Sequence, residues 1–335
     1  MPSLKTCFAL LVSLAAVSIA SAAAPSGFDP KTGGKLPDPC TTRPSGPAKQ
    51  VGIGMHVLRL NNMNIPNNQF SLDLWIWFRW ADDNIKPYET FELINGKIDS
   101  CQIERVDKFD GVNYACLRVS ATMSCFWDVS RFPLSRQKLT VEIEDKDMES
   151  HELVYVPDRD SCGVDSTFRA GGWQREGFMA DAFTHVYTTN YGDPRHKGEA
   201  NTRFSRATFT LQLARSGLLH SLKTFAGVFL ATLVAFTVFF VKPDYRLGLI
   251  VAAVFALVSS HVASAMYLPD ASVLTLADKL HLVAGVLVVI VMIEAALALH
   301  LMHKGREADF KRLDKLTFWT AAPLFFVVSV LLLVG

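Results

Sequence analysis

The chain has 335 residues, of which 50% are hydrophobic and only 19% carry a charged side chain. Soluble domains average about a quarter charged residues, so the apolar residues must be concentrated in part of the chain. The 33 Lys and Arg residues nearly balance the 32 Asp and Glu residues, for a net charge of +1. That balance argues against a nucleic-acid binder, which would carry a basic excess.

Residues 1–24 have the layout of a secretory signal peptide. A stretch with one charged side chain precedes an apolar run at residues 6–20. About 15 apolar residues are too few for a membrane span, and Ala20-Ser21-Ala22 fits the small-residue cleavage rule. We therefore expect a mature N-terminus outside the cytoplasmic membrane. Residues 25–48 are rich in proline and have no periodic pattern, which predicts a flexible or extended leader.

Residues 49–217 have the pattern of an all-β domain. Apolar residues alternate with other residues in several short runs, the period of strands buried on one face. Turn signals separate these runs at regular spacing, which favours an immunoglobulin-like sandwich. One face of the second run is expected to carry Leu72, Leu74, Ile76 and Phe78. The expected strands are residues 51–60, 70–80, 97–106, 114–127, 139–144, 151–156, 182–191 and 204–215.

Cysteines are few, and five remain after cleavage of the signal peptide. The space outside the membrane permits disulfides, but an odd number leaves at least one thiol, and sequence alone does not give the pairing. Cys101 and Cys116 flank a turn at Phe109-Asp110-Gly111, so they are the pair that we expect on adjacent strands. The five are Cys40, Cys101, Cys116, Cys125 and Cys162.

Four apolar runs follow the β domain, at residues 218–241, 247–268, 276–302 and 316–334 of a membrane domain 218–335. At 1.5 Å per residue, roughly 20 to 27 residues reach about 30 to 40 Å, enough to cross the hydrocarbon core. With the β domain outside, the outer link between the second and third runs has no Lys or Arg, whereas both inner links are basic. The inner charges are Lys242, Arg246, Lys304, Arg306, Lys311, Arg312 and Lys315.

Catalytic and metal-binding motifs are missing from the sequence. It has no nucleophile elbow, no phosphate-binding glycine loop, no His-Glu-x-x-His and no Cys-x-x-Cys. His300 and His303 lie three residues apart, but they fit interfacial polar residues better than a metal pair. We therefore expect no enzymatic activity, no cofactor and no bound metal.

Residues 125–139 differ from the rest of the β domain. By its own residues this segment is a strand, a proline-bearing turn and a second strand. It also resembles the signature loop of the pentameric ligand-gated ion channels, the Cys-loop receptor superfamily: Cys-x-x-Asp-Val-x-x-Phe-Pro-Phe-Asp-x-Gln-x-Cys. Leu139 replaces the second cysteine, so the loop disulfide is absent, as in bacterial members, and Ser135 replaces the usual Asp. The matching residues are Cys125, Asp128, Val129, Phe132, Pro133 and Gln137.

The chain from about residue 50 onward agrees with that resemblance. Trp80-Ala81-Asp82 is similar to the family's Trp-x-Asp, and the order of β domain, four spans and outside C-terminus is the family's order. Two departures are a first span without the usual proline and a poorly matched Trp-x-Pro segment before Asn95. The resemblance implies a prokaryotic homopentamer in the bacterial cytoplasmic membrane, with identical subunits and the lipid bilayer as partners.

The second span, from Arg246 to Pro269, resembles the pore helix of glycine receptors. It is also the span richest in small residues and serines, which suits a protein or water environment better than lipid. Steps of three and four residues place one stripe of side chains along it. In a five-fold bundle the stripe would line the pore, with Phe255 as an apolar gate; the alternative is ordinary helix packing. The stripe comprises Asp244, Gly248, Ala252, Phe255, Ser259, Val262 and Met266.

Three ionisable residues in the spans are functional candidates. A ring of five Asp244 carboxylates at the inner mouth would favour monovalent cations, unless Asp244 pairs with Lys242 or Arg246. His261 is a candidate proton sensor, or a satisfied interhelical histidine. Glu294 would be costly in the third span, and its simplest role is a protonated or hydrogen-bonded residue that faces the bundle interior.

The resemblance also implies a site for the stimulus and a route to the gate. The agonist would bind under the loop that joins the last two strands, and the signature loop would transmit its signal to the outer link. Protons, a small anion or no soluble ligand are all open as stimuli. Candidate agonist-site residues are Phe168, Trp173, Tyr187, Tyr191 and Arg195, and coupling residues are Asp128, Phe132, Pro133, Leu268 and Pro269.

The sequence thus predicts a ligand-gated, cation-selective channel whose gate is a hydrophobic constriction in the second span. The runner-up is a non-conducting, membrane-anchored periplasmic sensor or binding protein on the same scaffold. A pentamer with a water-filled central path would support the channel, and a monomer or dimer would support the sensor.

Overall fold

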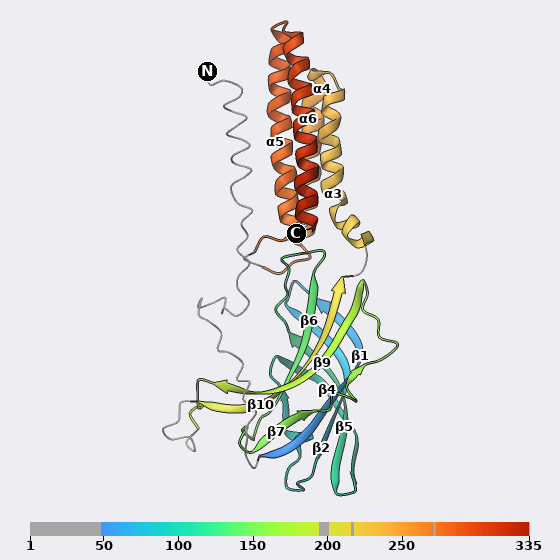
Figure 1. Ribbon diagram of the computed structural model, residues 1–335, viewed down its shortest axis with the longest axis vertical. Coiled ribbons are helices and arrows are strands. Elements are labelled where there is room, and N and C mark those ends of the chain that lie inside the picture. Colours follow the sequence, from blue (N-terminus) through green and yellow to red (C-terminus); the bar gives the residue numbers. More distant parts are fainter. Residues whose placement is uncertain (1–47, 194–200, 216–217, 271–272, 335) are drawn as a thin grey trace. The chain divides into compact units, whose positions relative to one another are not determined.

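The structure is a computed structural model that describes residues 48–193, 201–215, 218–270 and 273–334. A β-rich region is followed by four long helices (Figure 1). The predicted signal peptide, nearly all of the predicted leader, Cys40 and Arg195 lie outside the described residues.

The described strands form two sheets, as in a β-sandwich (Figure 1). One sheet has the order β4-β5-β2-β1-β7, with β8 paired to β1, and the other has the order β3-β6-β10-β9. The strands are β1 (Lys49–Asn64), β2 (Gln69–Trp80), β3 (Phe91–Leu93), β4 (Gly96–Phe109), β5 (Val112–Ser124), β6 (Arg136–Asp145), β7 (Leu153–Pro157), β8 (Gly163–Val164), β9 (Trp173–Tyr187) and β10 (Thr202–Arg215). A one-turn helix, α2 (Pro87–Thr90), precedes β3.

The strands bury every second residue in the core, as the two-residue period of the sequence predicted. Leu72, Leu74, Ile76 and Phe78 of β2 are at most 1% exposed, which confirms the predicted inward face. β6 and β10 alternate in the same way, with Leu139, Val141 and Ile143 of β6 buried.

Several strand boundaries differ from the prediction. β9 begins at Trp173 rather than at residue 182, because polar residues on its exposed face hide the period of its first half. The predicted turn after β4 is confirmed, since Asp110 and Gly111 both have positive φ angles, 48° and 81°. Such angles are those of a tight hairpin turn.

Cys101 and Cys116 lie on adjacent strands, β4 and β5, as predicted, but they do not form a pair. The hairpin register places Cys101 of β4 opposite Val119 of β5, and Cys116 opposite Arg105. Cys101 lies eight residues before Phe109 and Cys116 only four after Val112, the pair that closes the hairpin, so the two are out of register. All four described cysteines are free thiols.

Gly54 in β1 provides a test of the sheet packing, because a Cβ there would lie 2.1 Å from carbon atoms of the Trp77 ring. The Trp77 indole donates a hydrogen bond to Asp158 (3.1 Å), which holds the ring in place. We expect Gly54→Ala to destabilise the full chain by about 1–3 kcal/mol, seen as a lower melting temperature in detergent. Gly52→Ala is the matched control, since its Cβ would lie at an ordinary 3.5 Å from Arg79. Equal melting temperatures for the two variants would contradict this packing.

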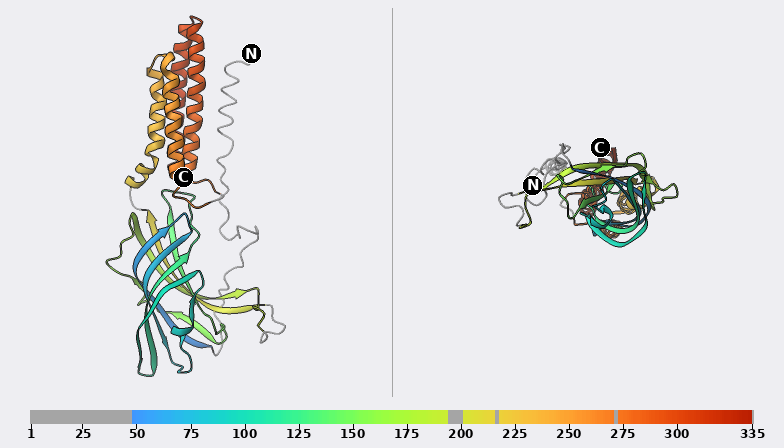
Figure 2. Two further views of the ribbon diagram at one scale, coloured as in Figure 1. Left: turned by 180° about the vertical axis from the view of Figure 1, so that it is seen from behind. Right: turned by 90° about the horizontal axis from the view of Figure 1, so that it is seen from below.

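All four long helices have the length and hydropathy of membrane spans, so the chain is a membrane protein. They run alongside one another (Figures 1 and 2). A charged amphipathic segment extends α6 to the N-terminal side of the predicted apolar run, and hydropathy marks only the run itself. The helices are α3 (Leu218–Thr237), continued by the 3₁₀ turn η2 (Val238–Phe240), α4 (Pro243–Ala265), α5 (Leu276–His303) and α6 (Glu307–Val334).

Helix starts follow local sequence signals. α4 begins at Pro243, whose fixed φ suits the first helical position and whose missing N–H costs no bond there. α5 begins with a capping box: the Thr275 hydroxyl accepts from the Asp278 N–H (3.1 Å), and the Asp278 carboxylate accepts from the Thr275 N–H (2.9 Å). These two signals fix where α4 and α5 begin.

Candidate functional site

α4 has one buried face and one exposed face. Arg246, Ile250, Ala253, Leu257 and Ser264 are buried against the other helices. The stripe predicted from the sequence lies on the opposite side of α4, and it is exposed in this chain. Phe255 is 70% exposed, Val262 54% and Met266 75%. Asp244, Gly248, Ala252 and Ser259 are also exposed.

Packing within the chain's own bundle therefore does not account for the stripe. A helix in lipid could expose apolar side chains on any face, but Gly248, Ala252 and Ser259 offer little apolar surface to lipid. The stripe's role as a pore lining stays a prediction.

The N-terminal end of α4 is joined to α5 and α6 by a buried ionic cluster. The Arg246 Nη1 lies 3.1 Å from Glu294 and 2.7 Å from Asp314, and its Nη2 lies 2.7 Å from Asp314. Its Nε donates to the Val241 carbonyl (3.0 Å), and its guanidinium stacks 5.2 Å from the Phe310 ring centre. Glu294 thus faces the bundle interior and is hydrogen-bonded, as predicted. Asp314 was missed, because only helix packing shows that it reaches Arg246.

A polar contact also joins the C-terminal half of α4 to its neighbours. The His281 Nε2 of α5 lies 3.1 Å from the Ser260 hydroxyl of α4. A Cβ at Gly227 of α3 would lie 2.4 Å from that same hydroxyl, so glycine allows the close approach. The His261 ring is 5.2 Å from the His281 ring, and its Nδ1 is 3.8 Å from Asp278. Sequence reasoning found His261 and missed its buried neighbour, His281.

The signature loop between β5 and β6 is closed by a side chain instead of a disulfide. The Gln137 amide donates to the Asp128 carbonyl (2.8 Å) and accepts from the Asp128 N–H (3.2 Å), and Gln137 is 3% exposed. The Asp128 carboxylate accepts from the Ser130 N–H and hydroxyl, at 3.0 and 2.6 Å. These two hydrogen bonds of Gln137 therefore close the loop, which Leu139 cannot close by a disulfide.

Main-chain hydrogen bonds join this loop to the first turn of α5. The Ser130 carbonyl accepts from the Leu276 N–H (3.0 Å), and the Phe132 carbonyl accepts from the Ala277 N–H (3.2 Å). Phe132 is 5% exposed, and Leu268 packs against the same core cluster. The predicted coupling residues Phe132 and Leu268 are thus part of one core cluster, which continues from the β domain into the start of α5.

The predicted agonist-site residues do not form one cluster within the chain. Trp173 and Tyr187 are the two ends of the 15-residue β9, about 45 Å apart at roughly 3.3 Å per residue. Phe168 and Trp173 line a cavity of about 610 Å³ with other residues of segment 165–175. Tyr187 and Tyr191 do lie together, with ring centres 5.6 Å apart. The grouping failed because the sequence showed only the second half of β9.

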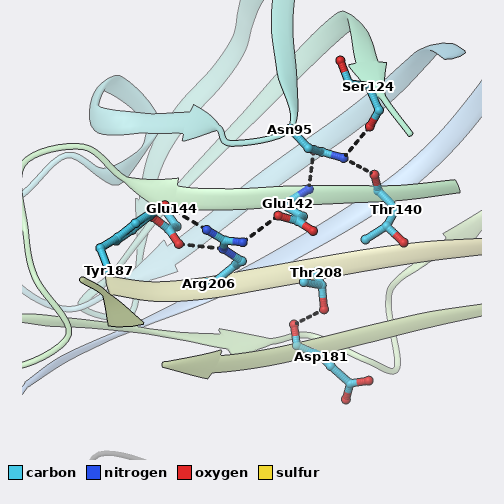
Figure 3. Close-up of polar contacts among 9 residues, drawn as sticks. All are labelled: Asn95, Ser124, Thr140, Glu142, Glu144, Asp181, Tyr187, Arg206 and Thr208. Carbon is cyan, nitrogen blue, oxygen red and sulfur yellow. Dashed lines mark hydrogen bonds and ion pairs between the residues drawn. The ribbon is translucent and has the colours of Figure 1, made fainter. Parts of the chain in front are cut away.

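Tyr187 belongs to a buried polar cluster on β6, β9 and β10. Figure 3 shows the Arg206 guanidinium between Glu142 and Glu144, beside the Tyr187 hydroxyl. Arg206 lies 2.6 Å from Glu144 and 2.7 Å from Glu142, and it donates to the Tyr187 hydroxyl (2.8 Å). Tyr187 in turn donates to Glu144 (3.0 Å). Arg206 is 8% exposed and Glu144 only 1%.

Burial and charge fix the protonation states of this cluster. Burial, with the neighbouring Glu144 carboxylate, raises the pKa of Tyr187. Burial opposes the charge of Arg206, but Glu144 and Glu142 outweigh it and raise its pKa. Burial and the nearby Arg206 lower the pKa of His185, whose ring is 4.5 Å from that of Tyr187. At neutral pH, Tyr187 therefore keeps its proton and Arg206 its charge.

A comparison of the sequence with models of known protein families finds no match. Among the described residues, no three His, Cys, Asp or Glu side chains are placed to hold a metal ion. The functional assignment therefore depends on the motifs and contacts above.

Proposed function

We propose that this chain is one subunit of a homopentameric ligand-gated ion channel in the bacterial cytoplasmic membrane. The β domain and the C-terminus would lie outside. A β-sandwich-like region followed by four apolar helices supports the proposal, as does the signature loop. The observation that carries it is the exposed stripe on α4, opposite the face that packs on the bundle.

The gate of this channel is the Phe255 ring. Five copies of α4 with their stripes turned inward would place Phe255 at a constriction, because Gly248 and Ala252 on its inner side have small side chains. An apolar constriction blocks ions when water leaves it. Val262 and Met266 would form a second apolar region on the outer side.

Cations are the permeant ions that the charges favour. Asp244 is exposed in the first turn of α4. Arg246 is 1% exposed and bound to Glu294 and Asp314, so it is not a partner of Asp244. Five Asp244 carboxylates at the inner mouth would concentrate monovalent cations and repel anions.

The opening signal would pass from the signature loop to α5 and the outer link. The hydrogen bonds from Leu276 and Ala277 to the loop carbonyls are a direct mechanical connection. The stimulus is a proton or a small molecule. The aromatic pair Tyr187 and Tyr191 is the part of the predicted agonist site that lies together in one chain.

Wild-type protein tests the proposal directly. We would measure the oligomer mass in detergent and the current in planar bilayers, while stepping the outer pH from about 7.5 to about 4.5 to titrate histidines and raised carboxylates. We expect a pentamer that carries a stimulated cation current. A monomer or dimer without current would overturn the proposal and favour the membrane-anchored sensor.

A further inference from the structure

We propose that Glu294 and Asp314 determine ion selectivity: their negative charge outweighs the positive charge of Arg246 behind the pore helix, so that no positive ring opposes the Asp244 ring at the inner mouth. The inference rests on the proposed channel function. Neither carboxylate lies on the predicted pore stripe, so both would act through Arg246, as positioning residues.

Arg246 is close enough to the inner mouth to matter. It lies in the first turns of α4, two residues after Asp244 and two before Gly248. At about 100° per residue, its side chain leaves the helix roughly 160° away from that of Gly248. The guanidinium is therefore behind the pore wall, at the depth of the mouth.

A lone arginine there would oppose cation flow. Its charge cannot be removed by deprotonation, and charges in a low-dielectric interior interact over longer distances than charges in water. Five such charges would form a positive ring behind the Asp244 ring. The buried partners prevent this, because two carboxylates surround each guanidinium.

The ionic cluster of Arg246, Glu294 and Asp314 is buried and closely hydrogen-bonded. Arg246 and Glu294 are 1% and 3% exposed. All three guanidinium nitrogens donate: Nε to the Val241 carbonyl, Nη1 to both carboxylates and Nη2 to Asp314. A planar guanidinium bound through all three nitrogens has one orientation, so its positive charge is fixed in place as well as outweighed.

The experiment compares isosteric variants. We would measure reversal potentials in a NaCl gradient for wild type and for Glu294→Gln/Asp314→Asn, which keeps the side-chain shapes and removes the negative charge. We expect the sodium-to-chloride permeability ratio to fall about tenfold. Asp309→Asn is the matched control, since it removes an exposed pair with Arg306 near the start of α6, and it should leave the ratio unchanged.

A rescue variant separates charge from structural damage. Arg246→Met/Glu294→Gln/Asp314→Asn has no charge in the cluster, and apolar replacement of a complete buried ion cluster is often tolerated. We expect its permeability ratio to return toward that of wild type. If the double variant fails to assemble, Asp314→Asn alone keeps Glu294 as a partner and should shift the ratio in the same direction by less.

Two outcomes would overturn this inference alone, and a third would overturn the proposed channel function as well. A cation-selective wild type whose carboxylate variants conduct with an unchanged ratio would overturn this inference and leave the channel function intact. A triple variant as chloride-permeable as the double variant would do the same. A pentameric wild type that carries no current under any stimulus would overturn the proposed function, and this inference with it.

Discussion

Phe255→Ala should pass cation current at rest, or open at a weaker stimulus than wild type. Phe255 is 70% exposed on the α4 stripe, so five rings would meet at the pore axis. Five alanines would leave a wider path that stays wet, which removes the dewetting barrier. We expect a resting current in planar bilayers at pH 7.5 about tenfold or more above wild type, equivalent to about 1.4 kcal/mol of gate stability.

Val254→Ala is the control for this variant. Val254 is the preceding residue, 40% exposed, and its side chain leaves α4 about 100° away from Phe255. It removes apolar volume at nearly the same depth without touching the stripe, so its resting current should match wild type. A similar leak from both variants would indicate a damaged bundle. A Phe255→Ala resting current no larger than that of Val254→Ala would place the gate elsewhere.

The features that the sequence predicted well are those that depend on one element at a time. Four spans followed from hydropathy because burial in lipid acts on each helix separately. The inward face of β2 followed from a two-residue period, since one face of a strand packs on the core. The stripe on α4 followed from steps of three and four residues, which place its members on one helix face, and its role as a pore lining stays a prediction.

The features that were missed depend on how elements meet. Asp314 and His281 are binding partners of α4 residues only because three helices pack together. The Cys101–Cys116 pairing failed for another reason: the two cysteines lie eight and four residues from the turn pair Phe109–Val112, so they do not face each other across the hairpin. A partner 68 residues away, as Asp314 is from Arg246, leaves no periodic signal in a sequence.

The largest stability loss that we expect comes from Arg206→Met. The change leaves the Glu144 carboxylate, whose side chain is 2% exposed, without its cation. Removing one partner of a buried ion pair costs about 3–5 kcal/mol, because the other charge is left buried and uncompensated. For a domain of this size we expect the melting temperature of the full chain in detergent to fall by about 10 °C.

Two further variants show whether the uncompensated charge is the cause. Arg203→Met removes an exposed arginine from the same strand and should change stability by less than about 0.5 kcal/mol. Arg206→Met/Glu144→Gln should recover most of the loss, because the amide carbonyl still accepts from the Tyr187 hydroxyl and no charge is buried. If the double variant melts as low as Arg206→Met, lost packing and not charge explains the effect. Recovery would mean that the uncompensated Glu144 carboxylate, and not the lost packing of the arginine side chain, destabilises Arg206→Met.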